Sequence, residues 1–270
     1  MEYLKKIENS IFDEYKKTVW ERFCDAVERY ELIKSGDRIA VCISGGKDSM
    51  LMAKLVELYR REVFGDFEVK YLVMDPGYNA ENRRKIEENA ALLNIPVTIF
   101  ESDIFEIANS TAKSPCYLCA RMRRGHLYAK AQELGCNKIA LGHHMSDVIE
   151  TIVLSMLYAS QVQGMLPKLH STNFEGMELI RPLYCIREED IISWCGHNGL
   201  EFIRCACRFT EGIPSGETDS KRQEVKELIR KLRADNPDIE KSIFESLHNL
   251  DLDSVIEYKT NGEVFNRYDS

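Results

Sequence analysis

The sequence predicts an α/β protein with an open parallel sheet and helices on both faces of that sheet. Two observations lead to this fold class. Short apolar segments alternate along the chain with amphipathic segments of ten or more residues, and a glycine-rich turn follows the first apolar segment. Strands that alternate with helices in this way form βαβ crossovers, which make neighbouring strands parallel. We therefore expect one sheet whose connecting loops meet at the carboxyl ends of its strands.

The predicted strands and helices follow one another in regular order. We expect strands at residues 38–43, 69–74, 96–100 and 138–141, and helices at 50–62, 79–93, 119–134 and 146–159. Residues 161–178 are richer in Gly, Pro and polar side chains, and we interpret them as a long functional loop. One more helix is expected at 187–198.

Helical extensions are predicted at both ends of the chain. Apolar residues recur every three or four positions from Leu4 to Val27, which predicts one long or two consecutive helices closed by Ser35-Gly36. We interpret them as packed on the main domain, with a homodimer contact as the alternative. The same spacing beyond Pro214 predicts two more helices. The expected division is 1–35 for the N-terminal extension, 36–212 for the main domain and 213–270 for the C-terminal extension.

Composition sets the class of protein. A chain of 270 residues with 44% hydrophobic and 30% charged residues is long enough for one large α/β domain with extensions, and has the composition of a soluble globular protein. No apolar segment is long enough to cross a membrane. Nine cysteines without a secretory signal indicate a reducing compartment, so we expect a cytoplasmic protein with no membrane partner.

The charge distribution is uneven. A net charge of -8 argues mildly against a nucleic-acid partner. Residues 107–132 nevertheless contain no Asp or Glu, and the cations in this segment are Lys113, Arg121, Arg123, Arg124 and Lys130. An ordinary solvated helix face usually mixes both signs of charge. This basic segment therefore favours a phosphate-bearing ligand nearby.

A candidate phosphate-binding loop lies between the first predicted strand and its helix, and we call residues 44–49 the first loop. It reads Ser44-Gly45-Gly46-Lys47-Asp48-Ser49. Backbone N–H groups and the positive helix end can hold phosphate oxygens at such a turn, and the glycines let the backbone approach the ligand. Lys47 adds a positive charge. Asp48 can hold Mg²⁺ against the phosphates.

The first loop does not match the two commonest phosphate-binding motifs. A Walker A loop needs Gly where this chain has Val41, and Ser or Thr where it has Asp48. A dinucleotide fingerprint of the G-x-G-x-x-G type is absent from the sequence.

The first loop resembles the S-G-G-x-D-S signature of the PP-loop ATP-pyrophosphatase superfamily. Members of that superfamily cleave ATP between the α and β phosphates and adenylate a substrate. The resemblance implies an adenine nucleotide α-hydrolase-like fold for the main domain. It also implies that ATP and Mg²⁺ are cofactors, with the ATP bound by Ser44, Gly45, Gly46, Lys47, Asp48 and Ser49.

A second loop, residues 141–147, follows another buried strand and begins another helix. It reads Leu141-Gly142-His143-His144-Met145-Ser146-Asp147. We expect Gly142 and Asp147 at the same edge of the sheet as Asp48, with Gly142 in the ATP site. Asp147 is a candidate second magnesium ligand or catalytic group, or a helix N-cap. The two histidines are candidates for phosphate or substrate contact, or for a structural role.

Asp75 is a further candidate for the ATP site. It ends the second predicted strand, in Val73-Met74-Asp75. This position matches one near the nucleotide in the superfamily.

Two cysteine pairs provide candidate metal ligands. Cys116 and Cys119 form a C-x-x-C at the start of a predicted helix, and Cys205 and Cys207 lie further along the chain. Thiolates in this arrangement suit an iron–sulfur cluster, a structural zinc site or a redox dithiol. The other five cysteines are interpreted as small buried hydrophobic residues.

The segment from Cys116 to Tyr128 is similar to the C-x-L-C-x-R-x-R-R-G-x-L-Y motif of the tRNA 2-thiocytidine synthetase family. The second loop, Gly164-Met165 with Pro167-Lys168-Leu169, and Arg181-Pro182-Leu183 also resemble that family. In the family, the C-x-x-C and one later cysteine hold a [4Fe-4S] cluster whose fourth iron stays open for the sulfur. The later motif departs from the pattern here, so the resemblance implies Cys116, Cys119 and Cys207 as ligands, with Cys205 as an alternative or additional one.

The sequence therefore predicts ATP-dependent sulfur transfer to tRNA, with a cysteine desulfurase or sulfide as the sulfur donor. The predicted catalytic residues are Asp48, Arg123 and Asp147, and Arg123 is assigned to catalysis or phosphate binding because the family carries a basic residue there. One alternative is a PP-loop adenylating enzyme that acts on a small molecule. Another is a zinc-stapled nucleotide-binding protein.

Overall fold

A computed structural model describes residues 2–102, 115–203 and 217–268 of the chain; for 115–121 and 217–220 it describes the helix and not the side chains. The chain divides into two compact units. The first comprises Met1–Val148 and Met165–Ser220, and the second comprises Ile149–Gly164 and Lys221–Ser270. The division into 1–35, 36–212 and 213–270 stays a prediction.

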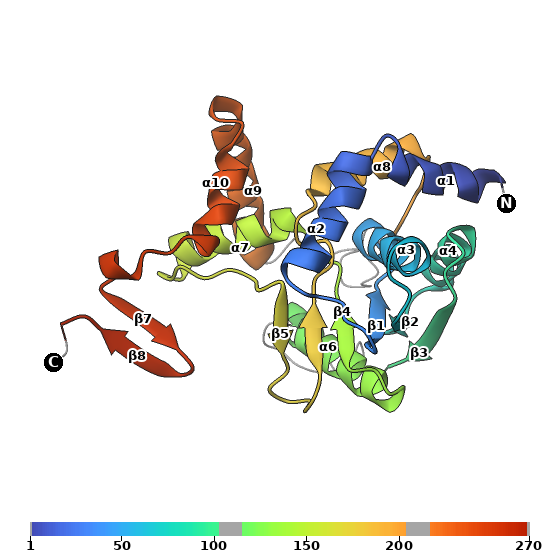
Figure 1. Ribbon diagram of the computed structural model, residues 1–270, viewed down its shortest axis with the longest axis horizontal. Helices are drawn as coiled ribbons and strands as arrows, with labels where there is room; N and C mark the ends of the chain where they lie inside the picture. The colour runs from blue at the N-terminus through green and yellow to red at the C-terminus, as the bar shows by residue number, and fades with distance from the viewer. Residues whose placement is uncertain (1, 103–114, 204–216, 269–270) are drawn as a thin grey trace. The chain divides into compact units, whose positions relative to one another are not determined.

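The first unit is built on a six-stranded sheet in the order β3-β2-β1-β4-β6-β5 (Figure 1). The strands are β1 (Arg38–Ile43), β2 (Glu68–Asp75), β3 (Val97–Glu101), β4 (Lys138–Ala140), β5 (Lys168–His170) and β6 (Glu178–Ile180). All neighbouring strands are parallel except β5 and β6, which are antiparallel. The predicted open parallel sheet is confirmed, with one antiparallel strand at its edge.

Strands β5 and β6 correct the predicted loop at residues 161–178. That segment contains all of β5 and the first residue of β6. Each of these strands has three residues, which is too short for the two-residue alternation of a strand to be visible in the sequence.

Helices cover both faces of the sheet. As a result, the side chains of β1 are buried on both faces. Successive residues of a strand point to opposite faces. Ala40 and Cys42 belong to one core cluster with Tyr128 and Ala131 of α6 (Pro115–Glu133). The alternate residues of the same strand, Ile39, Val41 and Ile43, are also buried. A helix-covered sheet of this kind is what the apolar strands predict.

Four more helices pack in the first unit and continue the predicted order. They are α3 (Lys47–Glu62), α4 (Ala80–Leu92), the start of α7 (Met145–Tyr158) and α8 (Glu188–His197). Asn79 caps the beginning of α4, where its side chain accepts a hydrogen bond of 2.7 Å from the N–H of Asn82. These helices lie within a few residues of the predicted ranges.

The N-terminal segment forms two consecutive helices that pack on the first unit. They are α1 (Glu2–Phe12) and α2 (Glu21–Arg29), and a π-helical turn joins them. Lys54 of α3 is fully buried, and its ammonium lies 2.5 Å from Glu8 of α1 and 2.8 Å from Glu57. A buried charge needs such partners, so this contact ties the N-terminal helix to the main domain.

The second unit contains the remaining part of α7 with α9 (Glu217–Asp235), α10 (Ile239–Glu245) and a hairpin of β7 (Glu257–Thr260) and β8 (Glu263–Asn266). Glu150 of α7 is buried and pairs with Arg222 at 3.1 Å and Lys226 at 3.5 Å. The sequence analysis predicted the helices and missed the hairpin. Its turn is Asn261-Gly262, a pair typical of two-residue hairpin loops, and this signal could have found it.

Among the helices that the structure describes, we find none long and apolar enough to span a lipid bilayer.

Candidate active site

The first loop turns sharply between β1 and α3. Gly45 has a φ of 86°, a left-handed backbone conformation that residues other than glycine rarely adopt. A Cβ added at Gly45 would lie 2.5 Å from Cγ1 of Ile86 and 2.7 Å from Cδ1 of Ile203. Both the backbone conformation and the packing therefore require glycine at this position.

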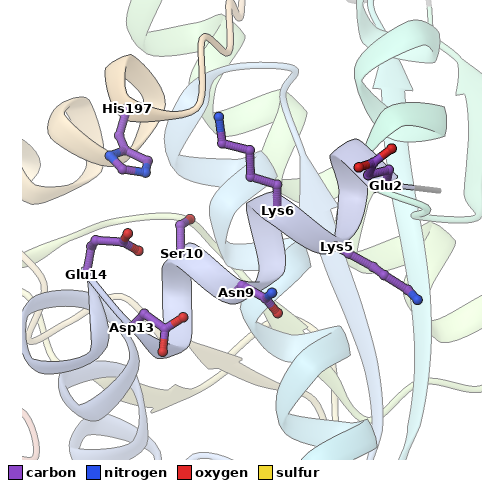
Figure 2. Close-up of a pocket in the computed structure, with 8 residues that line it drawn as sticks. All are labelled: Glu2, Lys5, Lys6, Asn9, Ser10, Asp13, Glu14 and His197. Atoms are coloured by element: carbon purple, nitrogen blue, oxygen red, sulfur yellow. The ribbon is translucent and has the colours of Figure 1, made fainter.

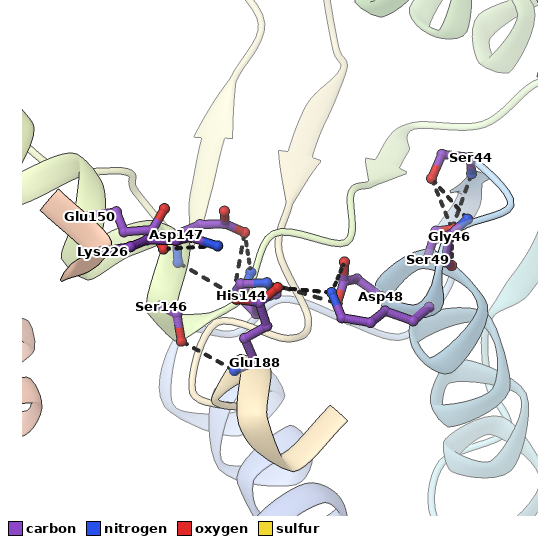
Figure 3. Close-up of polar contacts among 11 residues, drawn as sticks. Ser44, Gly46, Asp48, Ser49, His144, Ser146, Asp147, Glu150, Glu188 and Lys226 are labelled. Atoms are coloured by element: carbon purple, nitrogen blue, oxygen red, sulfur yellow. Dashed lines mark hydrogen bonds and ion pairs between the residues drawn. The ribbon is translucent and has the colours of Figure 1, made fainter. Parts of the chain in front are cut away.

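Hydrogen bonds of Ser49 hold the first loop together (Figure 3). Its hydroxyl donates to the carbonyl of Gly46 at 3.0 Å and accepts from the N–H of Ser44 at 3.1 Å. Gly46 is the N-cap of α3 and has no side chain that could accept from the first turn of the helix. The N–H groups of a first helical turn have no partners inside the helix. The first loop is therefore a fixed turn, and the helix that follows it begins with backbone donors of the kind that bind anions.

Lys47 lies between two carboxylates from different parts of the chain. Its ammonium is 3.1 Å from Oδ1 of Asp48 and 3.0 Å from Oε1 of Glu188, the first residue of α8. Burial alone would lower the pKa of Lys47, but the charges of Asp48 and Glu188 raise it above its usual value. Lys47 is therefore a permanent cation beside the first loop.

The second loop touches the first loop through its backbone. A Cβ on Gly142 would lie 3.1 Å from the backbone nitrogen of Ser49 and 3.2 Å from its Cα. Such a close approach needs glycine, and it places the carboxyl ends of β1 and β4 at one site. The structure thus brings Gly142 together with the first loop, as the sequence analysis expected.

His144 and Asp147 cap the beginning of α7 reciprocally (Figure 3). The N–H of His144 donates to Oδ2 of Asp147 at 3.1 Å, and the N–H of Asp147 donates to Nδ1 of His144 at 3.3 Å. Nε2 of the buried His144 lies 3.8 Å from Oδ1 of Asp48. The imidazole therefore lies between Asp147 and Asp48 without a hydrogen bond to the Asp48 carboxylate. The N-cap position belongs to His144, and Asp147 is its partner in the first turn of α7 and not the N-cap itself.

Asp75 lies at the carboxyl end of β2, where its carboxylate closes the following turn. It accepts from the N–H groups of Gly77 at 2.8 Å and Tyr78 at 2.7 Å, and from Arg83 at 2.6 Å. Burial alone would raise the pKa of Asp75, but these hydrogen bonds and the charge of Arg83 hold it below its usual value. The hydroxyl of Tyr78 donates to the carbonyl of Ser44 at 3.5 Å, so this turn reaches the first loop.

The remaining predicted site residues lie on α6 or outside the described residues. Arg123 is half-buried on α6. Cys116 and Cys119 lie in the first two turns of α6, in the part where the helix is described and its side chains are not. Cys205 and Cys207 lie outside the described residues.

The five cysteines without a predicted metal role are free thiols, and all except Cys24 are buried. Burial raises the pKa of Cys42 to about 12 and the pKa of Cys195 to about 11. Thiols of this kind are unreactive near neutral pH. The interpretation of small buried hydrophobic residues therefore holds for Cys42, Cys136, Cys185 and Cys195, and not for the partly exposed Cys24.

The amino-acid sequence of the chain matches a known domain family. The chain matches the PP-loop domain over residues 15–207. This chain belongs to the PP-loop family. The predicted resemblance to the PP-loop superfamily is confirmed, and both loops of the site lie within the matched range.

Curated relatives of this PP-loop protein cover nearly its full length. A tRNA-cytidine(32) 2-sulfurtransferase from Citrifermentans bemidjiense is 35% identical over 248 residues, which are 90% of this chain and 93% of the relative. A protein of the same name from Geotalea daltonii is 36% identical over 244 residues, which are 89% and 94% of the two chains. The predicted similarity to the tRNA 2-thiocytidine synthetase family is therefore confirmed.

A solved structure shares the PP-loop fold. It is the U34-tRNA thiolase from Methanococcus maripaludis with its [4Fe-4S] cluster, which aligns with a TM-score of 0.67 at 20% identity over 86% of this chain and 79% of the thiolase. This likeness confirms the predicted fold class.

Asp48 has an oxygen suited to a metal ion. Oδ1 of Asp48 is buried and accepts no hydrogen bond from the described residues, although the Lys47 ammonium lies 3.1 Å away. Within the described ranges, no group of three or more His, Cys, Asp or Glu side chains is gathered closely enough to hold a metal ion by itself. Mg²⁺ usually takes one or two carboxylates and completes its shell with phosphate oxygens and water. The donor set fits Mg²⁺ that arrives with a nucleotide.

A separate cavity of about 340 Å³ lies beside α1 and the end of α8 (Figure 2). Its walls combine both signs of charge, and its lining residues are Glu2, Lys5, Lys6, Asn9, Ser10, Asp13, Glu14 and His197. None of the predicted site residues lines it. We assign it no role in the chemistry of the two loops.

Glu188 is the site residue that the sequence analysis missed. The helix at 187–198 was predicted without any role in the site. The local feature that could have pointed to Glu188 is the acidic start of that helix, Glu188-Glu189-Asp190. Glu188 follows Arg181 of the Arg181-Pro182-Leu183 motif by seven residues. Nothing in the local sequence connects Glu188 with Lys47, because the two residues are 141 positions apart.

Proposed function

We propose that this PP-loop protein is an enzyme that transfers sulfur to tRNA at the expense of ATP, which is split to AMP and pyrophosphate. The observation that carries the proposal is the backbone contact between the two loops, which brings Lys47, Asp48, His144 and Asp147 to one edge of the sheet. The names of its relatives, tRNA-cytidine(32) 2-sulfurtransferases, supply the substrate class.

The first loop would hold the pyrophosphate end of ATP. The backbone donors at the start of α3 and the ammonium of Lys47 suit phosphate oxygens. Asp48 would hold Mg²⁺ together with those oxygens, because its Oδ1 is buried and accepts no hydrogen bond from the described residues. Gly142 lies against the same loop. The turn of Asp75 supports it through Tyr78.

Adenylation is the first chemical step. A carbonyl oxygen of the target base attacks the α-phosphate of ATP, a P–O bond forms, and pyrophosphate leaves with the electron pair of the broken bond. Negative charge moves onto the pyrophosphate, where Lys47 and the cation on Asp48 would stabilise it. We assign Arg123 to the same charge. Asp147 would act by holding the ring of His144, which lies between the two carboxylates.

Replacement of the activated oxygen by sulfur is the second step. Hydrosulfide attacks the base carbon, a carbon–sulfur bond forms and the sulfur loses its proton, the carbon–oxygen bond breaks, and AMP leaves with the former carbonyl oxygen and the electron pair of that bond. We propose that Cys116 and Cys119 hold a [4Fe-4S] cluster with Cys207, or with Cys205 in its place or in addition, since thiolates are the usual ligands of such clusters. When bound, the cluster supplies an iron site for the sulfur. The sulfur donor would be a cysteine desulfurase or sulfide, in the cytoplasm.

The test combines the two products of the reaction. Anaerobically reconstituted protein is incubated with ATP, Mg²⁺, sulfide and unmodified tRNA, and then AMP is quantified and the digested tRNA is searched for thionucleosides by mass spectrometry. We expect AMP and a thionucleoside in equal amounts, and neither product with Lys47→Met. AMP release without any thiolated base would overturn the assignment to RNA.

A further inference from the structure

The ammonium of Lys47 is held by a residue that belongs to neither loop. Glu188 of α8 lies 3.0 Å from it, and Asp48 of the first loop lies 3.1 Å from it. All three side chains are about three-quarters buried. The charges on Lys47 and Glu188 are therefore partly shielded from water, and their ion pair is stronger than one at the surface.

The position of Glu188 is fixed by the second loop (Figure 3). The N–H of Glu188 donates to the hydroxyl of Ser146 at 3.1 Å, and the carbonyl of Ile186 accepts from the N–H of Met145 at 2.8 Å. These two hydrogen bonds join the beginning of α8 to the beginning of α7. Glu188 is thus held by backbone contacts, and its carboxylate reaches from there to Lys47.

Asp48 and Glu188 have different roles around Lys47. If Asp48 holds Mg²⁺ when a nucleotide binds, its carboxylate is shared with the metal and no longer fixes the ammonium alone. Glu188 keeps one of the three N–H donors of Lys47 and leaves the others for phosphate oxygens. A lysine side chain loses considerable rotamer freedom when it is ordered, so holding it before the ligand arrives favours binding.

We propose that Glu188 is a positioning residue that keeps the ammonium of Lys47 directed at the phosphates of ATP. The proposal rests on the proposed function, because it assumes that the first loop binds ATP. It names a residue outside both loops and outside the cysteine motifs. Glu188 acts through Lys47 and itself touches neither the metal nor the nucleotide.

The test is a double-mutant cycle on ATP affinity with the full chain. Isothermal titration calorimetry measures ATP binding in the presence of Mg²⁺ for wild type, Glu188→Gln, Lys47→Met and the double variant. We expect Glu188→Gln to weaken ATP binding about tenfold, equivalent to about 1.4 kcal/mol, and Lys47→Met to weaken it more. The double variant should bind ATP as Lys47→Met does, because Glu188 has no effect once its partner is gone.

Two further measurements separate positioning from a general structural effect. Glu188→Gln should raise the KM for ATP about tenfold and also lower kcat, because Lys47 stabilises the negative charge that moves onto the pyrophosphate in the transition state. Glu189→Gln is the matched control. It makes the same chemical change one residue further along α8, where the carboxylate pairs with Arg187 at 3.3 Å. It should leave ATP affinity and thermal unfolding unchanged.

Three results would overturn the proposal. Unchanged or tighter ATP binding by Glu188→Gln would show that Glu188 does not support Lys47. Glu188→Gln could also weaken ATP binding by the same factor in the Lys47→Met background as in wild type. If a higher Mg²⁺ concentration then restores that affinity, Glu188 is a metal ligand. Wild-type affinity in Lys47→Met would reject the ATP site of the proposed function, and the role of Glu188 with it. If Lys47→Met is impaired and Glu188→Gln is not, only the role of Glu188 fails.

Discussion

The first and second loops lie against each other through Ser49 and Gly142, yet they use their hydrogen bonds in different ways. The first loop is closed by the hydroxyl of Ser49, and its helix begins at a glycine without a side-chain cap. In the second loop the helix start is capped by its own side chains, since His144 and Asp147 bond to each other's backbone.

Because of this difference, the two loops are suited to different roles in the site. An uncapped helix start offers backbone N–H groups to an anion, whereas a capped start has already used them. The first loop is therefore suited to phosphate oxygens. The second loop is suited to present an imidazole and a carboxylate, and its glycine lets it come close enough to do so. Four substitutions test this division of roles.

Loss of the Asp48 carboxylate should have the largest effect. Asp48→Asn keeps the size of the side chain but removes the charge that would hold Mg²⁺ at the phosphates. We expect the rate of AMP formation to fall about a thousandfold, in the range seen when a catalytic electrostatic contact is removed. Quenched-flow assays with labelled ATP give this rate. A loss smaller than about tenfold would remove Asp48 from the chemistry.

Asp147→Asn should have a smaller effect, because Asp147 would act by holding the ring of His144. We expect AMP formation to fall about tenfold to a hundredfold, similar to the loss of an outer-shell partner of a metal site. The same assay measures it. A loss as large as that of Asp48→Asn would mean that Asp147 touches the metal or the substrate directly, and the two loops would then have equivalent roles.

Much of this site could be predicted from the sequence because its signals are local. The Ser-Gly-Gly-Lys-Asp-Ser turn and Gly142 are read from neighbouring residues, and both loops follow apolar segments that predict strands. Glu188 could not be predicted, since its contact with Lys47 depends on how α8 packs. The reciprocal cap of His144 and Asp147 was only half predicted, because an N-cap and a ligand look alike in sequence.

In the fold, too, the features that depend on contacts between distant segments could not be predicted from local sequence. Strands with five or more apolar residues, such as β1 and β2, were found at nearly their observed positions. The three-residue strand β6 pairs with β4, and β5 pairs with β6, so both strands depend on pairing with another segment of the chain and not on a local sequence pattern. The antiparallel edge of the sheet was therefore not foreseen.

Gly142→Ala tests the contact between the loops. The added methyl group would lie 3.1 to 3.3 Å from backbone atoms of Asp48 and Ser49, which cannot move aside as a side-chain end can. Overpacking of this kind costs about 1–3 kcal/mol, so we expect a lower unfolding temperature and about tenfold weaker ATP binding.

Gly196→Ala in α8 is the matched control, because nothing lies within 4 Å of a Cβ there. Alanine is the better helix former, so this variant should unfold at the same or a higher temperature. Equal behaviour of the two alanine variants in both measurements would contradict a close contact between the loops.

Asp75→Asn extends the comparison to the turn after β2 and should have the smallest effect on ATP affinity, a few-fold at most. Its main effect should be on stability. The pKa of Asp75 is lowered in the folded protein, so its charge stabilises the fold above the usual Asp range and this contribution is lost as the pH falls through the folded-state pKa.

We therefore expect Asp75→Asn to reduce the free energy of unfolding by about 1–3 kcal/mol at pH 7, and by less below about pH 4. Urea unfolding at several pH values measures this. A loss of stability that stays constant down to pH 3 would contradict the role of the Asp75 charge.

We expect ATP to activate an oxygen of the tRNA itself, so this oxygen should leave the base as part of AMP. The reaction is run in water enriched in ¹⁸O with unmodified tRNA, sulfide, Mg²⁺ and ATP, and the AMP is analysed by mass spectrometry. If the base is adenylated and its oxygen replaced by sulfur, the AMP carries the unlabelled oxygen of the base. AMP labelled with ¹⁸O from the solvent would mean that water attacks ATP, and would contradict adenylation of the tRNA base.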